Sequence, residues 1–140
     1  MDYYQIAATI SLIFQIVVLV LLFAGMGLKG RKKFRQHGIV MLTAVVLHTI
    51  IILAWMVPSF SLSFAGSINF ADMIVVTILV HAFMGIAADL LGIWLVASWR
   101  LRADMKTCFA KKSLMRVTMT LWLIALFLGI VLYLKIIQIF

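Results

Sequence analysis

Two histidines stand in stretches of sequence that are otherwise almost entirely apolar. His48 lies in the run 38–57, GIVMLTAVVLHTIIILAWMV, and His81 lies in the run 73–98. An ionisable side chain inside such a run is costly in lipid unless it has a partner, so it points to a functional role. Two imidazoles that meet can be axial ligands of one haem, ligands of a metal ion, or hydrogen-bond partners across a helix bundle.

Counting residues places the two histidines at the same expected depth. His48 lies nine residues before Val57, where its run ends, and His81 lies eleven residues after Phe70, where the next run begins. At 1.5 Å per residue on antiparallel helices, both lie about 14–17 Å from the same surface. We therefore expect the two rings to face the same interior space. The sequence leaves open whether they ligate haem, ligate a metal ion or only hydrogen-bond.

Small residues accompany His81 along one helical face. They recur at intervals of three or four positions, and they are Thr77, Gly85, Ala88 and Gly92. Such a face either allows another helix to approach closely or clears room for a flat cofactor beside His81. Gly85, one turn from His81, is therefore a candidate cofactor-binding position together with the two histidines.

Asp89 and His37 are candidates for proton handling. Asp89 is the one carboxylate well inside an apolar run, about 80° around the helix from His81. His37 precedes His48 by three helical turns and lies on the same face. Each also has a structural interpretation: Asp89 as the partner of a basic residue from the loops, and His37 as an interfacial basic residue.

Composition indicates a membrane protein. Hydrophobic residues make up 66% of the 140 residues and charged residues 11%, which is more apolar surface than a soluble domain of this size can cover. The net charge of +8 comes from two clusters, Lys29–Gln36 and Arg100–Arg116, which hold eleven of the twelve basic residues. Clusters beside apolar runs are typical of membrane orientation, so we expect no nucleic-acid partner. We also expect no enzyme activity, since the chain has no hydrolytic or transferase motif.

The chain is expected to form a single domain, residues 1–140, with an all-α fold: an integral-membrane four-helix bundle. The spans are predicted at about 6–28, 37–57, 70–98 and 117–139, with Pro58 ending the second. Gln15 is the strongly polar side chain of the first span, and we expect it to hydrogen-bond to a neighbouring helix. Both basic loops should be cytoplasmic and both termini outside, as in a multi-pass protein of the cell membrane.

The order of these motifs resembles the small four-helix membrane family called "domain of unknown function 420", which includes CtaM-like proteins associated with maturation of haem–copper oxidases. The residues that carry the resemblance are Arg35-Gln36-His37, His48, His81, and Trp122, Leu123, Gly129 and Tyr133 of the last span. The chain departs from the family at 109–113, FAKKS, where the family usually has a further histidine.

The resemblance implies an accessory or assembly protein of a respiratory-type membrane oxidoreductase. The paired histidines make haem b, held between His48 and His81, the candidate cofactor. One alternative is a purely structural subunit of a larger membrane metalloenzyme, such as a terminal oxidase or a copper membrane monooxygenase. Another is a free-standing b-type cytochrome. The expected partners are the lipid bilayer and larger membrane oxidoreductase subunits.

Overall fold

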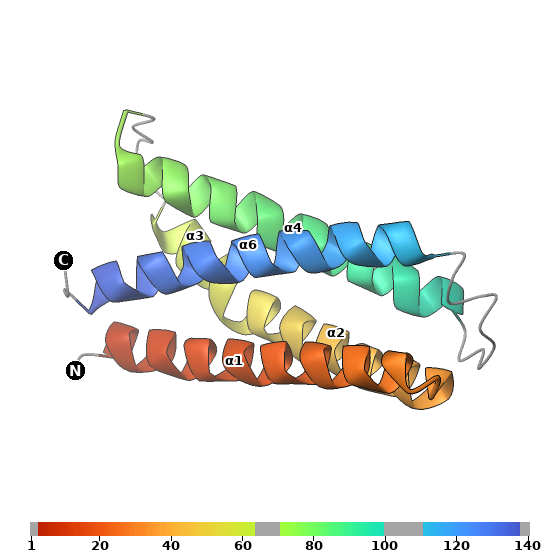
Figure 1. The fold of residues 1–140 in the computed structure, drawn as a ribbon. Helices are drawn as coiled ribbons and strands as arrows, with labels where there is room; N and C mark the ends of the chain where they lie inside the picture. The colour runs from red at the N-terminus through yellow and green to blue at the C-terminus, as the bar shows by residue number, and fades with distance from the viewer. Residues whose placement is uncertain (1–2, 64–70, 100–110, 138–140) are drawn as a thin grey trace.

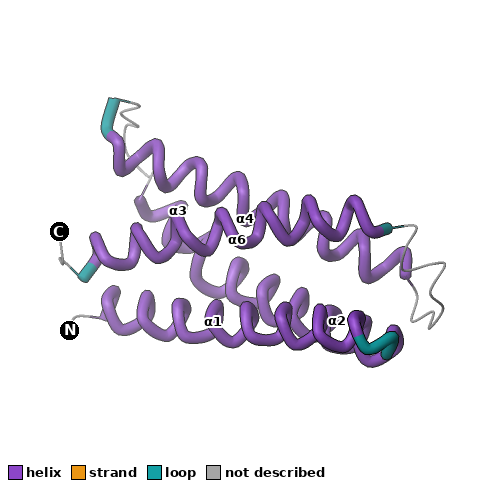
Figure 2. The backbone as a smooth tube through the Cα atoms, in the orientation of Figure 1, coloured by secondary structure: helices purple, strands orange, loops and turns teal. Residues whose placement is uncertain are grey.

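The chain is all-helical wherever a computed structural model describes it, at residues 3–63, 71–99 and 111–137 (Figures 1 and 2). The elements are α1 (Tyr3–Gly30), α2 (Phe34–Ile51), the π-helical turn η1 (Ile52–Met56), α3 (Val57–Ser63), α4 (Met73–Trp99) and α6 (Lys112–Ile136). Within these residues, four helical stretches are long and apolar enough to cross a membrane: Gln5–Gly30, Phe34–Ser61, Met73–Trp99 and Lys112–Ile136. The expected start of the third span at 70, the expected end of the fourth span at 139, and residues 100–110 of the second basic cluster lie outside the described residues.

The helices form two closely packed pairs. α1 packs along α2, and α4 packs along α6, whereas contacts between the pairs are fewer (Figure 1). The start of α1 is tied to the end of α6: the Gln5 side-chain amide donates to the Ile136 carbonyl at 3.3 Å, and the hydroxyls of Thr9 and Tyr133 lie 3.0 Å apart. Looser contact between the pairs leaves room for cavities along the middle of the molecule.

Apolar side chains occupy both the core and the outer surface. The core cluster takes residues from all four long stretches and comprises Val18, Leu22, Ala44, Val45, Ile51, Ala88 and Trp122. Large apolar side chains also point outward, such as Phe23, Phe83 and Phe127, which are 52%, 68% and 65% exposed. A soluble helix carries polar residues on its outer face, so an outer face of this kind suits the hydrocarbon of a bilayer. The chain has the character of a multi-pass membrane protein.

A tight turn returns the chain from α1 to α2. The Lys33 N–H donates to the Leu28 carbonyl at 2.9 Å, and the Lys32 N–H donates to the Lys29 carbonyl at 3.0 Å. This is the Schellman arrangement, which places one residue in the left-handed region. That residue is Lys32, with φ of 59°, where glycine is the usual choice.

Pro58 does not end the second helix. The helix continues through η1 into α3, and Pro58 is the second residue of α3. A proline in a regular helix loses one hydrogen bond and its ring clashes with the carbonyl four residues earlier, here that of Ala54. The π turn at Ile52–Met56 widens the helix at this carbonyl, which explains how the helix passes the proline.

Trp99, the last residue of α4, fixes the approach of α4 to α2. Its side chain is buried, and its indole lies directly against Gly38. A Cβ at position 38 would overlap the ring, so only glycine allows this crossing.

Candidate functional site

His48 is held at the centre of the bundle by α1 and α6. Its side chain is 3% exposed, and its ring lies 4.4 Å from the Trp122 ring, between centroids, at an interplanar angle of 42°. Its Nδ1 lies 3.2 Å from the Gln15 side-chain amide nitrogen. The oxygen and nitrogen of an amide are assigned from their hydrogen bonds, so the Gln15 amide can either donate to Nδ1 or, turned over, accept the Nδ1 proton. The interhelical hydrogen bond expected of Gln15 is confirmed.

The second ring nitrogen of His48 has no hydrogen bond. Its Nε2 and the Ser59 hydroxyl are the two buried side-chain polar atoms without a partner among the described residues. The Gly85 carbonyl interacts with the His48 ring but makes no hydrogen bond of good geometry. A buried polar atom left without a partner costs about 1–3 kcal/mol, so such atoms mark places where a ligand or water belongs.

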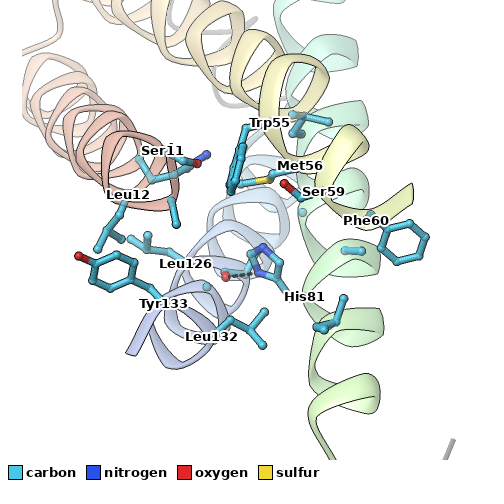
Figure 3. Close-up of a pocket in the computed structure, with 18 of the residues that line it drawn as sticks. Ser11, Leu12, Trp55, Met56, Ser59, Phe60, His81, Leu126, Leu132 and Tyr133 are labelled. Atoms are coloured by element: carbon cyan, nitrogen blue, oxygen red, sulfur yellow. Dashed lines mark hydrogen bonds between the residues drawn. The ribbon is translucent and has the colours of Figure 1, made fainter. Parts of the chain in front are cut away.

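His81 is oriented by the neighbouring helix of its own pair. Its Nδ1 proton is donated to the Ala125 carbonyl of α6 at 2.8 Å, as the dashed line in Figure 3 shows. A neutral imidazole that donates from Nδ1 carries its lone pair on Nε2, which is the usual arrangement of a metal-ligating histidine. Gly129 of α6 makes room for the ring, because a Cβ there would lie 3.0 Å from His81 Cε1.

Both rings line one cavity of about 330 Å³ between the helix pairs. Figure 3 shows its wall: Ser11 from α1, Trp55 and Met56 from η1, His81 from α4 and Tyr133 from α6. Ser59, with its unpartnered hydroxyl, also borders it. The two orphaned polar atoms of the described chain thus belong to residues of the same cavity wall.

The small-residue face of α4 changes role along its length. At Gly85 an added Cβ would meet nothing within 4 Å, so this glycine borders the cavity. At Gly92 an added Cβ would lie 3.1 Å from Val45 and 3.4 Å from Trp122, and Ala88 between them is fully buried. One part of the face therefore opens room beside His81, and the other allows a close helix approach.

Asp89 and His37 do not join the two histidines. Asp89 is buried and accepts a hydrogen bond from the Thr49 hydroxyl at 2.8 Å. His37 is also buried, with Nδ1 2.6 Å from the Gly25 carbonyl, and it lines a different cavity. The described residues contain no group of three or more His, Cys, Asp and Glu side chains that could hold a metal ion. Proton handling by this pair stays a prediction.

The sequence did not predict three residues of the cavity wall: Met56, Ser59 and Trp122. Ser59 enters the cavity because the helix continues past Pro58, and Met56 enters it from the π turn before that proline. A sequence signal existed only for Trp122, which lies on the face of α6 that also carries Ala125 and Gly129.

No protein-family model, curated protein or solved structure matches this chain. The site therefore rests on its own geometry.

Proposed function

We propose that the protein is a small accessory or assembly protein of a respiratory-type membrane oxidoreductase, and that His48 and His81 hold haem b within it. The observation that carries this proposal is the shared cavity: two imidazoles from different helix pairs border it, and each has its Nδ1 engaged by another helix. This leaves Nε2 of both rings for a ligand. The unpartnered Nε2 of His48 supports an occupant.

The residues present suit haem in chemistry, whereas the space is tight. Two neutral imidazoles in an apolar wall, those of His48 and His81, would hold a b-type haem, which would supply one-electron transfer. The cavity volume of about 330 Å³ lies at the lower end of the range for ligand pockets, and His48 Nε2 is sealed by its neighbours. Haem would therefore enter only with a separation of the two helix pairs.

The proposal includes the cell membrane as the location, with the basic clusters at 29–36 and 100–116 in the cytoplasm. Four long apolar helices and outward-facing apolar side chains support insertion in a bilayer. The distribution of basic residues supports the orientation.

A structural subunit of a larger membrane metalloenzyme is the second candidate function. The observation that favours it is that each histidine already has an interhelical partner within the chain, Gln15 or the Ala125 carbonyl. Two such hydrogen bonds would fasten the bundle without any cofactor.

Purification in mild detergent separates these two functions. Haem between the histidines should give the sharp reduced-minus-oxidised α band of a six-coordinate b-type haem. His48→Ala and His81→Ala should each abolish the band, whereas His37→Ala should retain it, because His37 lines another cavity. A colourless, metal-free protein that co-purifies with large subunits in fixed ratio would overturn the haem proposal in favour of the structural function.

A further inference from the structure

A second and larger cavity lies at the basic end of the bundle. Its volume is about 970 Å³, close to the upper end of the range for ligand pockets. All four long helices contribute apolar side chains to its wall, such as Leu22, Met41, Val96 and Met119. Trp122 lines both cavities, so its indole lies between them. The space suits a long apolar chain rather than a small polar molecule.

Four basic residues line the same cavity: Lys29, Lys32, Lys112 and Arg116. No carboxylate belongs to its wall within the described part of the chain. The Lys29 ammonium reaches across to α6, where it lies 3.7 Å from the Met115 sulfur. A thioether is a weak acceptor for an ammonium group, so an oxyanion at this point would be the better partner.

The turn after α1 contributes one of these charges. Lys32 takes the left-handed position of the turn after α1, with φ of 59°. A side chain in that region costs about 1–2 kcal/mol relative to glycine. The turn that ends α1 therefore holds the backbone of a positively charged residue at the cavity wall.

We infer that this cavity binds an anionic phospholipid, with an acyl chain among the apolar residues and the phosphate against Lys29, Lys32 and Arg116. Basic pockets between membrane helices recognise acidic headgroups, because the phosphate offers oxygens to Lys and Arg while the chain stays in an apolar wall. A zwitterionic lipid would bring its own positive group to the same cations and bind more weakly. The inference does not depend on haem at the other cavity.

Binding to the full-length protein tests the inference. Native mass spectrometry in detergent would measure adducts with dioleoylphosphatidylglycerol and, for comparison, dioleoylphosphatidylcholine. We expect a one-to-one phosphatidylglycerol adduct with at least tenfold tighter binding. The double variant Lys29→Gln/Arg116→Gln should lose at least tenfold of that affinity. The matched control Lys33→Gln/Arg35→Gln removes the same charge from exposed residues outside the cavity wall and should bind as the parent does.

Three results would overturn the inference. Equal weakening in both double variants would mean diffuse attraction to a basic surface, and equal binding of the two lipids would mean no recognition of charge. Val96→Phe adds volume inside the cavity without changing any charge, and it should weaken phosphatidylglycerol binding in a protein that still elutes as the parent does. Unchanged binding to that folded variant would place the acyl chain elsewhere.

Discussion

Polar side chains inside the bundle are satisfied mostly by partners on another helix. His48 meets Gln15, His81 meets the Ala125 carbonyl, and Asp89 meets Thr49. Such bonds stabilise because the alternative is an unpaired polar group in an apolar medium. The two exceptions among the described residues, His48 Nε2 and the Ser59 hydroxyl, are therefore informative, since both residues line one cavity.

Thr49 provides a test of this argument at a single residue. Thr49→Val should destabilise the protein by about 1–3 kcal/mol, because the buried Asp89 carboxylate loses the hydroxyl that donates to it. Thr43→Val is the matched control: this hydroxyl is exposed and bonds to the Ile39 carbonyl of its own helix, so its loss should change stability little. Unfolding in a denaturing detergent series measures both. Equal effects of the two variants would show that the Asp89 contact contributes nothing.

At the scale of the element, one face of α4 packs closely against other helices at Gly92 and borders a cavity at Gly85. Gly92 allows Val45 and Trp122 to approach, whereas Gly85 borders open space. Gly38 of α2 allows another close contact, with the Trp99 indole of α4. The positions of these glycines decide where the two helix pairs touch and where a cavity remains between them.

Alanine substitution at these three glycines should change the stability of the protein by different amounts. Gly85→Ala should stabilise by about 0.5–1 kcal/mol, since alanine favours helix and its Cβ meets nothing. Gly38→Ala should destabilise by about 1–3 kcal/mol, because the Cβ overlaps Trp99. Gly92→Ala should fall between them, since Val45 must yield slightly. Thermal denaturation in detergent measures the order, and a Gly85→Ala protein as unstable as Gly38→Ala would contradict an open space at Gly85.

The whole molecule has a basic end and an end without clustered charge. The turn after α1 carries Arg31, Lys32 and Lys33, and Arg35 follows at the start of α2. α6 begins at Lys112 at the same end of the helix pairs (Figure 1). The start of α1 and the end of α6 meet at the opposite end through Thr9 and Tyr133. A bilayer around the molecule would therefore have the basic end on one side and both of these helix ends on the other.

Labelling of the single cysteine tests which side the basic end occupies. Cys108 belongs to the basic stretch 100–116, so a membrane-impermeant maleimide should reach it only after the cells are opened. Tyr3→Cys in a Cys108→Ser background should be labelled in intact cells, because Tyr3 is exposed at the other end. The reverse pattern would invert the proposed orientation and leave the helix packing unaffected.

The sequence alone determined the helical class, the four apolar stretches and the charge clusters. These follow from local composition, because about 20 apolar residues suffice to span a bilayer whatever their neighbours are. Residue counts of nine and eleven also predicted a similar depth for His48 and His81. Both line one cavity, although the helix continues past Val57 and α4 begins at Met73.

Only the tertiary structure decided how each helix is rotated about its axis. Lipid-facing and buried positions are both apolar here, so the pattern does not distinguish Phe83 on the surface from the core. The packing of the helices brought the Thr49 hydroxyl to the Asp89 carboxylate as a hydrogen-bond donor. It also buried His37 against the Gly25 carbonyl. The π turn also places Met56 and Ser59 in the wall of the cavity that the histidines line. The sequence did not predict this turn, because a π turn depends on the arrangement of the backbone carbonyls before Pro58 rather than on residue type.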